Sequence, residues 1–127
     1  MSIPSRILAS GNSPLATISI AGDGATALVA VGTTQATALQ LSAVFNAIAV
    51  SAASTGVKLP PCEAGAVIFI YNLAGQDLKV YTNEATGVTM NAAVAGATGV
   101  VLGNTKTAIC FGTSATTWAV TAALSST

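Results

Sequence analysis

Charge is what this sequence has least of. Charged residues make up 6% of the 127 residues, against a usual share of about a quarter. The four basic residues are Arg6, Lys58, Lys79 and Lys106; they lie far apart, and four acidic residues balance them. Binding to nucleic acid needs clustered Lys or Arg that displace counterions from phosphates, and a basic amphipathic membrane helix needs a similar cluster. We therefore expect neither nucleic acid nor membrane as a partner.

Histidine is absent, and cysteine occurs only at positions 62 and 110. Catalysis by histidine and histidine-ligated metal sites are therefore excluded. The sequence contains no Cys-x-x-Cys spacing, no nucleophile elbow and no glycine-rich phosphate loop. We interpret Cys62 and Cys110 as two small buried side chains in a reducing compartment, and a disulfide between them stays open. We expect no cofactor, no metal and no enzymatic activity.

Long apolar runs are also missing, although hydrophobic residues reach 52%. Polar residues interrupt the longest weakly polar stretch, Ala25 to Ala53, so it is too short to cross a membrane. The first eleven residues have no apolar core of signal-peptide length. We therefore expect a soluble chain made in the cytoplasm. So much apolar surface with so little charge predicts an oligomer or a docked subunit.

The residues that are abundant favour strands. Alanine is mixed with Thr, Val, Ile and Gly, while the Glu, Lys and Arg that solvate a helix are scarce. Turn residues recur every 8–12 positions. The pattern predicts an all-β fold, a single-domain β-sandwich or jelly-roll-like barrel of about eight short antiparallel strands. Residues 1–14, with Pro4 and the breaker Gly11 to Pro14, are predicted to form an extended N-terminal arm before a sandwich domain of residues 15–127.

Individual strands follow from alternation and from turn residues. Ala16 to Ala21 and Ala25 to Val31 are predicted to form a hairpin about the turn Gly22-Asp23-Gly24. A helix from Gln35 to Ala49 competes with two short strands there. The other predicted strands are Thr37 to Leu41, Val44 to Ser51, Val57 to Leu59, Ala66 to Tyr71, Asp77 to Thr82, Val88 to Asn91, Thr98 to Leu102, Lys106 to Gly112 and Thr117 to Ala122. Because Ala66 to Tyr71 is apolar on both faces, we expect it to be covered on one side by the core and on the other by a neighbour.

One block of the sequence resembles small structural proteins of tailed-bacteriophage virions. The matching segments are Gly56 to Pro60, Ala64-Gly65, Tyr71-Asn72, Leu78 to Tyr81, Gly87 with Met90-Asn91, and Phe111 with Trp118 to Val120, while Thr33 to Thr37 and Asn46 to Ile48 are similar upstream. The resemblance covers about two-thirds of the chain. It implies a capsid decoration (cement) protein, a head fibre or a similar accessory, and it carries no catalytic residues.

The resemblance and the composition together predict a subunit of the virion, on the capsid surface. We expect it to form a homotrimer or homodimer and to bind the major capsid protein, with the arm reaching a neighbour or the capsid. The predicted partner-binding residues are Arg6, Ile7, Leu8, Ile68, Ile70 and Tyr81.

Two other functions stay open at this point. One is a head or tail fibre component. The other is a carbohydrate-binding receptor module, for which Tyr81 is the best exposed aromatic candidate, whereas Tyr71 and Trp118 are expected in the core. The pair Asp77 and Glu84 is interpreted as a solvated edge rather than as acid–base chemistry.

Overall fold

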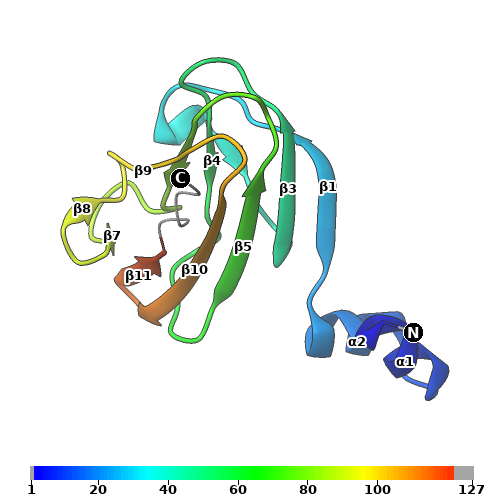
Figure 1. The fold of residues 1–127 in the computed structure, drawn as a ribbon. Coiled ribbons are helices and arrows are strands. Elements are labelled where there is room, and N and C mark those ends of the chain that lie inside the picture. The colour runs from blue at the N-terminus through cyan, green and yellow to red at the C-terminus, as the bar shows by residue number, and fades with distance from the viewer. Residues whose placement is uncertain (1, 122–127) are drawn as a thin grey trace.

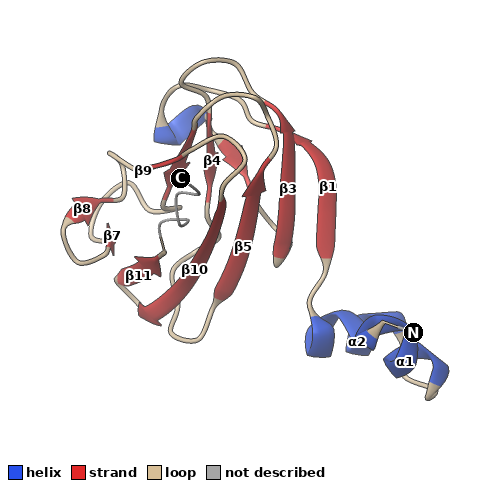
Figure 2. Cartoon of the chain, viewed as in Figure 1, coloured by secondary structure: helices blue, strands red, loops and turns tan. Residues whose placement is uncertain are grey.

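The computed structural model describes residues 2–121, and strands are its main regular secondary structure (Figure 1). Met1 and residues 122–127 lie outside the described part of the chain. The predicted last strand therefore has its end, Ala122, outside it, as do the first residue of the predicted arm and the last residues of the predicted sandwich domain. Figure 2 shows that helix is confined to the N-terminal segment and one short turn.

The N-terminal segment is helical where an extended arm and a strand were predicted. Helix α1 runs over Ile3–Ala9 and α2 over Pro14–Ala21. The hydroxyl of Ser13 accepts a hydrogen bond from the amide of Ala16 (3.1 Å), and Pro14 occupies the first turn, where its missing N–H costs nothing. Gly22, with φ of +81°, ends α2. The hairpin predicted about Gly22 to Gly24 is therefore wrong, because its first half is a helix.

Within residues 2–121, eleven strands form two sheets, which confirms the predicted β-rich class. The prediction of about eight strands, all antiparallel, is wrong, because the strands are more numerous and both sheets mix parallel and antiparallel pairs. The larger sheet has the order β1 (Gly24–Val29), β3 (Phe45–Val50), β5 (Val67–Asn72), β10 (Thr107–Ser114), β11 (Thr117–Val120), β7 (Thr89–Met90) and β8 (Val94–Ala95). The smaller sheet has the order β2 (Leu39–Gln40), β4 (Gly56–Lys58), β6 (Leu78–Tyr81) and β9 (Val100–Leu102). A short 3₁₀ helix, η1 (Gln35–Thr37), precedes β2.

The chain winds alternately through the two sheets, which explains the parallel pairs. From β1 to β6 each strand of the larger sheet is followed by a strand of the smaller one. Successive strands within one sheet therefore run the same way: β1, β3 and β5 pair in parallel, and so do β2, β4 and β6. Parallel neighbours require a long crossover, and here each crossover contains a strand of the opposite sheet. Antiparallel pairing is found further along the chain, for example between β10 and β5.

The core lies between the two sheets. The larger sheet contributes Ile48, Ile70 and Trp118, and the smaller one contributes Leu78 and Val80; all five are fully buried. The predicted inward positions of Leu78 and Val80 and the core position of Trp118 are confirmed. The strand predicted at Val44 to Ser51 is also confirmed as β3, and the competing helix is wrong, because helix there is limited to η1.

Candidate functional site

The outward side of the larger sheet is the most unusual surface of the described chain. Along β5, Ile68 and Ile70 point into the core, whereas Val67 and Tyr71 are 39% and 42% exposed and Phe69 is partly exposed. Along β10, Ile109 and Phe111 are likewise exposed, at 39% and 40%. Strand alternation therefore sends one apolar row inward and a second apolar row outward.

The strand register brings these outward side chains together. Phe69 of β5 lies opposite Ile109 of β10 on one side and opposite Phe45 of β3 on the other. The rings of Phe45 and Phe69 stack with centroids 4.8 Å apart and an angle of 17° between their planes. We call the six side chains of this surface the outer apolar face: Phe45, Val67, Phe69, Tyr71, Ile109 and Phe111.

Charge is absent from this face. None of the strands of the larger sheet that the structure describes contains Asp, Glu, Lys or Arg. The smaller sheet, by contrast, carries Lys58 and Lys79, both partly exposed. Soluble monomers usually protect an exposed sheet with charged side chains. The outer apolar face has no such protection.

A groove of about 350 Å³ runs along this face between β1, β3 and β5. Its wall includes Gly24 to Thr26, Phe45, Phe69, Tyr71 and Thr107. Because aromatic rings and small side chains make this wall mainly apolar and none of the lining residues is charged, the groove suits an apolar side chain of another protein segment rather than a charged ligand.

The sequence prediction placed the partner-binding residues of this strand on the wrong face. Ile68 and Ile70 are 5% and 0% exposed and belong to the core. The residues that face outward are Val67, Phe69 and Tyr71, and the prediction missed them, together with Phe45, Ile109 and Phe111. Tyr71 was expected in the core but is exposed. The sequence indicated that both alternating rows of residues 66–71 are apolar, but it did not indicate which of the two rows faces the core.

Tyr81 is buried rather than exposed, so the prediction of an accessible aromatic there is wrong. It is 4% exposed, and its hydroxyl donates to the carbonyl of Thr33 (3.2 Å). A Cβ atom at Gly56 or Gly99 would lie 2.6 Å or 2.8 Å from the Tyr81 ring. The ring therefore occupies a slot that only glycines leave open.

The predicted arm residues lie on α1. Arg6 and Leu8 are exposed and Ile7 is partly buried. The structure does not bring these three residues together with the outer apolar face of the same chain, since α1 and α2 project beyond the end of β1 (Figure 1).

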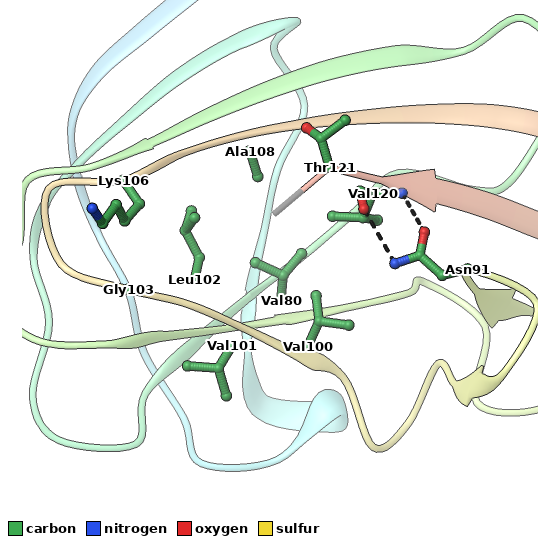
Figure 3. A pocket seen from close by; sticks show the side chains of 10 residues that line it. All are labelled: Val80, Asn91, Val100, Val101, Leu102, Gly103, Lys106, Ala108, Val120 and Thr121. Atoms are coloured by element: carbon green, nitrogen blue, oxygen red, sulfur yellow. Dashed lines mark hydrogen bonds between the residues drawn. The ribbon is translucent and has the colours of Figure 1, made fainter. Parts of the chain in front are cut away.

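A second cavity, of about 340 Å³, opens beside the core between β9 and the C-terminal strands (Figure 3). Val80, Val100, Leu102, Ala108 and Val120 give it apolar walls. The side chain of Asn91 at its rim holds the backbone of Val120 through both its amide nitrogen (3.1 Å) and its oxygen (2.8 Å). Among the residues that line it, Lys106 is the charged one, Thr121 carries the one hydroxyl group, and none is acidic.

The titratable side chains have structural roles where the structure shows their contacts. Glu84 accepts a hydrogen bond from the amide of Cys62 (2.9 Å), and Asp77 accepts one from the amide of Asn104 (3.1 Å). Both cysteines are free thiols. Burial raises the pKa of Cys110 to about 12; burial, followed by the nearby carboxylate of Glu84, raises the pKa of Cys62. Neither thiol is therefore activated as a nucleophile.

Within residues 2–121, no three His, Cys, Asp or Glu side chains gather as metal ligands. No helix of this part of the chain is long and apolar enough to cross a membrane. Comparison with protein-family models, with curated proteins and with solved structures found no match for this chain.

Proposed function

We propose that this protein is a non-enzymatic structural subunit of a virion, a capsid decoration protein that binds the outer capsid surface as an oligomer and stabilises the shell. The observation that carries the proposal is the outer apolar face, an uncharged and exposed surface of aromatic and branched side chains. The resemblance to small bacteriophage virion proteins supports the capsid as the place of assembly.

The size of this face supports a role in assembly. An aromatic side chain has about 150–250 Å² of surface, so the five side chains of this face that are 39–46% exposed, with the partly exposed Phe69, leave on the order of 400 Å² accessible. At about 25 cal/mol per Å², covering it contributes about 10 kcal/mol before the entropy cost of association. The largest apolar patch of a soluble protein is commonly about 300–600 Å² and is often a functional surface, and the outer apolar face falls in this range.

The lack of charge supports repeated, closely packed contacts. Burying an ion costs free energy unless it is paired, and this face contains none. A capsid repeats each contact many times, so modest individual contacts give firm attachment through avidity.

The test measures the mass of the purified chain in solution and its binding to capsids of the virus that encodes it. We expect an oligomer that co-sediments with capsids in fixed stoichiometry. Phe69→Asp, which puts a charge on the outer apolar face, should abolish both properties. The matched control is Val101→Asp, at a 59% exposed position of β9 in the smaller sheet, which should retain self-association. A monomeric wild-type chain that ignores capsids would refute the proposal.

A further inference from the structure

The helices α1 and α2 are as poorly covered as the outer apolar face. Their large apolar side chains Ile3, Leu8, Leu15, Ile18 and Ile20 are between 45% and 75% exposed. Helix α2 contains no charged residue, and its apolar side chains are not confined to one side. A helix that is apolar on all sides is normally buried. The N-terminal segment therefore requires a surface that covers it. From here on we call residues 2–22, which include both helices and extend beyond the predicted arm of residues 1–14, the arm.

The arm is also too short to be stable alone. Its helices have seven and eight residues, whereas isolated helices shorter than about 12 residues are marginal in water. They pack against each other, but no residue of either helix belongs to the core cluster of the described chain. The caps at Ser2 and Ser13 specify where the helices begin, and packing against another surface must supply the remaining stability.

The root of the arm is fixed at the margin of the outer apolar face. The carboxylate of Asp23 accepts a hydrogen bond from the amide of Val44 (2.9 Å), and its carbonyl accepts one from the amide of Phe45 (2.9 Å). A Cβ atom at Gly22 would lie 3.1 Å from the Phe45 ring. From this root the helices extend away from the body (Figure 1). The C-terminal end of the arm is thus fixed beside the outer apolar face, while its helices extend away from the face of the same chain.

We infer that the arm of one copy covers the outer apolar face of a second copy, and that the exchange is reciprocal. Arg6 is the one charged residue of the arm sequence and the face has none, so a sparsely charged apolar segment meets an uncharged apolar surface. Each arm exposes an apolar area on the same order as the face, about 400 Å². Two arms on two faces then bury about 1,600 Å², the standard size of a stable protein interface. This inference rests on the proposed function only in that both require an oligomer.

The first experiment compares three double variants of the full chain by light scattering and sedimentation. Ile18→Glu with Ile20→Glu alters the arm, and Ile109→Glu with Phe111→Glu alters the face. Val31→Glu with Val101→Glu is the matched control, at exposed apolar positions beside or within the smaller sheet. We expect the arm and face variants each to weaken self-association by about 100-fold or more, and the control to stay oligomeric. Circular dichroism must show folded strands in all three.

Mixing the two defective variants separates arm exchange from direct packing of two faces. The face variant keeps a normal arm and the arm variant keeps a normal face, so one of the two contacts can form between them. We expect a heterodimer in native mass spectrometry, although neither variant self-associates. If two faces packed directly on each other, the arm variant would remain oligomeric alone and mixing would restore nothing, which would overturn the inference.

A crosslink tests the contact in an otherwise unaltered chain. A photoreactive amino acid replaces Ile20, and isotope-labelled and unlabelled copies are mixed before illumination. We expect crosslinked peptides that join the arm of one copy to β3, β5 or β10 of the other, with mixed labels. Crosslinks confined to single chains would mean that the arm folds back on its own face and would overturn the exchange. Capsid binding by such a monomer would still be measurable, so failure of the exchange and failure of the proposed function remain distinguishable.

Discussion

Asn72 connects three parts of the chain through one buried side chain. At the end of β5, its amide nitrogen donates to the carbonyls of Gln76 (2.8 Å), Leu102 (3.1 Å) and Gly103 (3.2 Å), and its oxygen accepts from the amide of Ala74 (3.0 Å). Buried polar groups are costly unless they are paired. Asn72 therefore holds the turn after β5 against β9 of the other sheet.

Cys110 makes the stability of the protein depend on alkaline pH. Its pKa is raised by burial from 9.0 to about 12, so the folded state keeps the thiol proton at a pH where the unfolded chain has lost it. The contribution to stability is complete below pH 9 and is lost as the pH rises towards 12. We expect the free energy of unfolding to fall by about 1.4 kcal/mol per pH unit across this window from this group alone.

Denaturant unfolding of wild type and Cys110→Ala at a series of pH values measures this effect. The variant should be less stable at neutral pH because of the lost packing, and its stability should decline less steeply above pH 9. Cys62→Ala, which keeps the Cys110 thiol, should retain the steep decline. Parallel curves for wild type and Cys110→Ala would contradict the prediction.

Burial at single positions was predictable only where the pattern was one-sided. Leu78 and Val80 alternate with Asp77 and Lys79, and their burial follows from the sequence. The burial of Tyr81 could not be predicted in this way, because the slot that holds its ring depends on Gly56 and Gly99, which come from distant parts of the chain. For residues 66–71 both rows are apolar, so the choice between Ile68 and Phe69 depends on the opposite sheet and is invisible in the segment itself.

At the scale of elements, the ends of α2 decided its structure. Ile18 and Ile20 alternate as in a strand, which is why a strand was predicted at Ala16 to Ala21. Ser13-Pro14 at one end and Gly22 at the other are cap and stop signals of a helix. These helix signals outweighed the strand-like alternation, which rests on Ile18 and Ile20 alone. The same signals at Ser2 and Pro4 mark α1.

Removing the arm should leave the body folded. The helices α1 and α2 supply no residue of the core cluster, and the body keeps the strands that the structure describes from β1 onward. We expect a chain lacking residues 1–21 to keep the far-ultraviolet circular dichroism of its strands and cooperative thermal unfolding. It should lose self-association. Loss of the cooperative transition would show instead that the arm is part of the folding unit.

For the whole molecule, the sheet-rich class was predictable and the topology was not. Turn residues and β-branched residues indicated short strands, but the same local pattern serves parallel and antiparallel pairs. The direction of pairing depends on whether a connection returns to the same sheet or crosses to the other. That choice is made by contacts such as Phe45 opposite Phe69, more than twenty residues apart.

The assembled state should respond little to ordinary salt. The surfaces proposed to meet contain Arg6 as their charged residue, so screening has little to weaken. Between about 0.05 and 0.5 M sodium chloride we expect the dissociation constant to change by less than about threefold, and sulfate should tighten association. Sedimentation equilibrium measures both effects. Dissociation that grows tenfold or more with sodium chloride would indicate an interface built on ion pairs.

The alternate winding through the two sheets also governs how such a chain can change in length. One full circuit is about 18 to 24 residues long, because the register sets Leu39 opposite Val57, Gly24 opposite Phe45 and Phe45 opposite Phe69. Each circuit contacts mainly the one before and the one after it. Insertion or deletion of a complete circuit would keep the remaining strand pairs in register. Loss of a single residue within a strand would instead exchange its core-facing and solvent-facing side chains. Related chains with this architecture should therefore differ in length by whole circuits rather than by single residues.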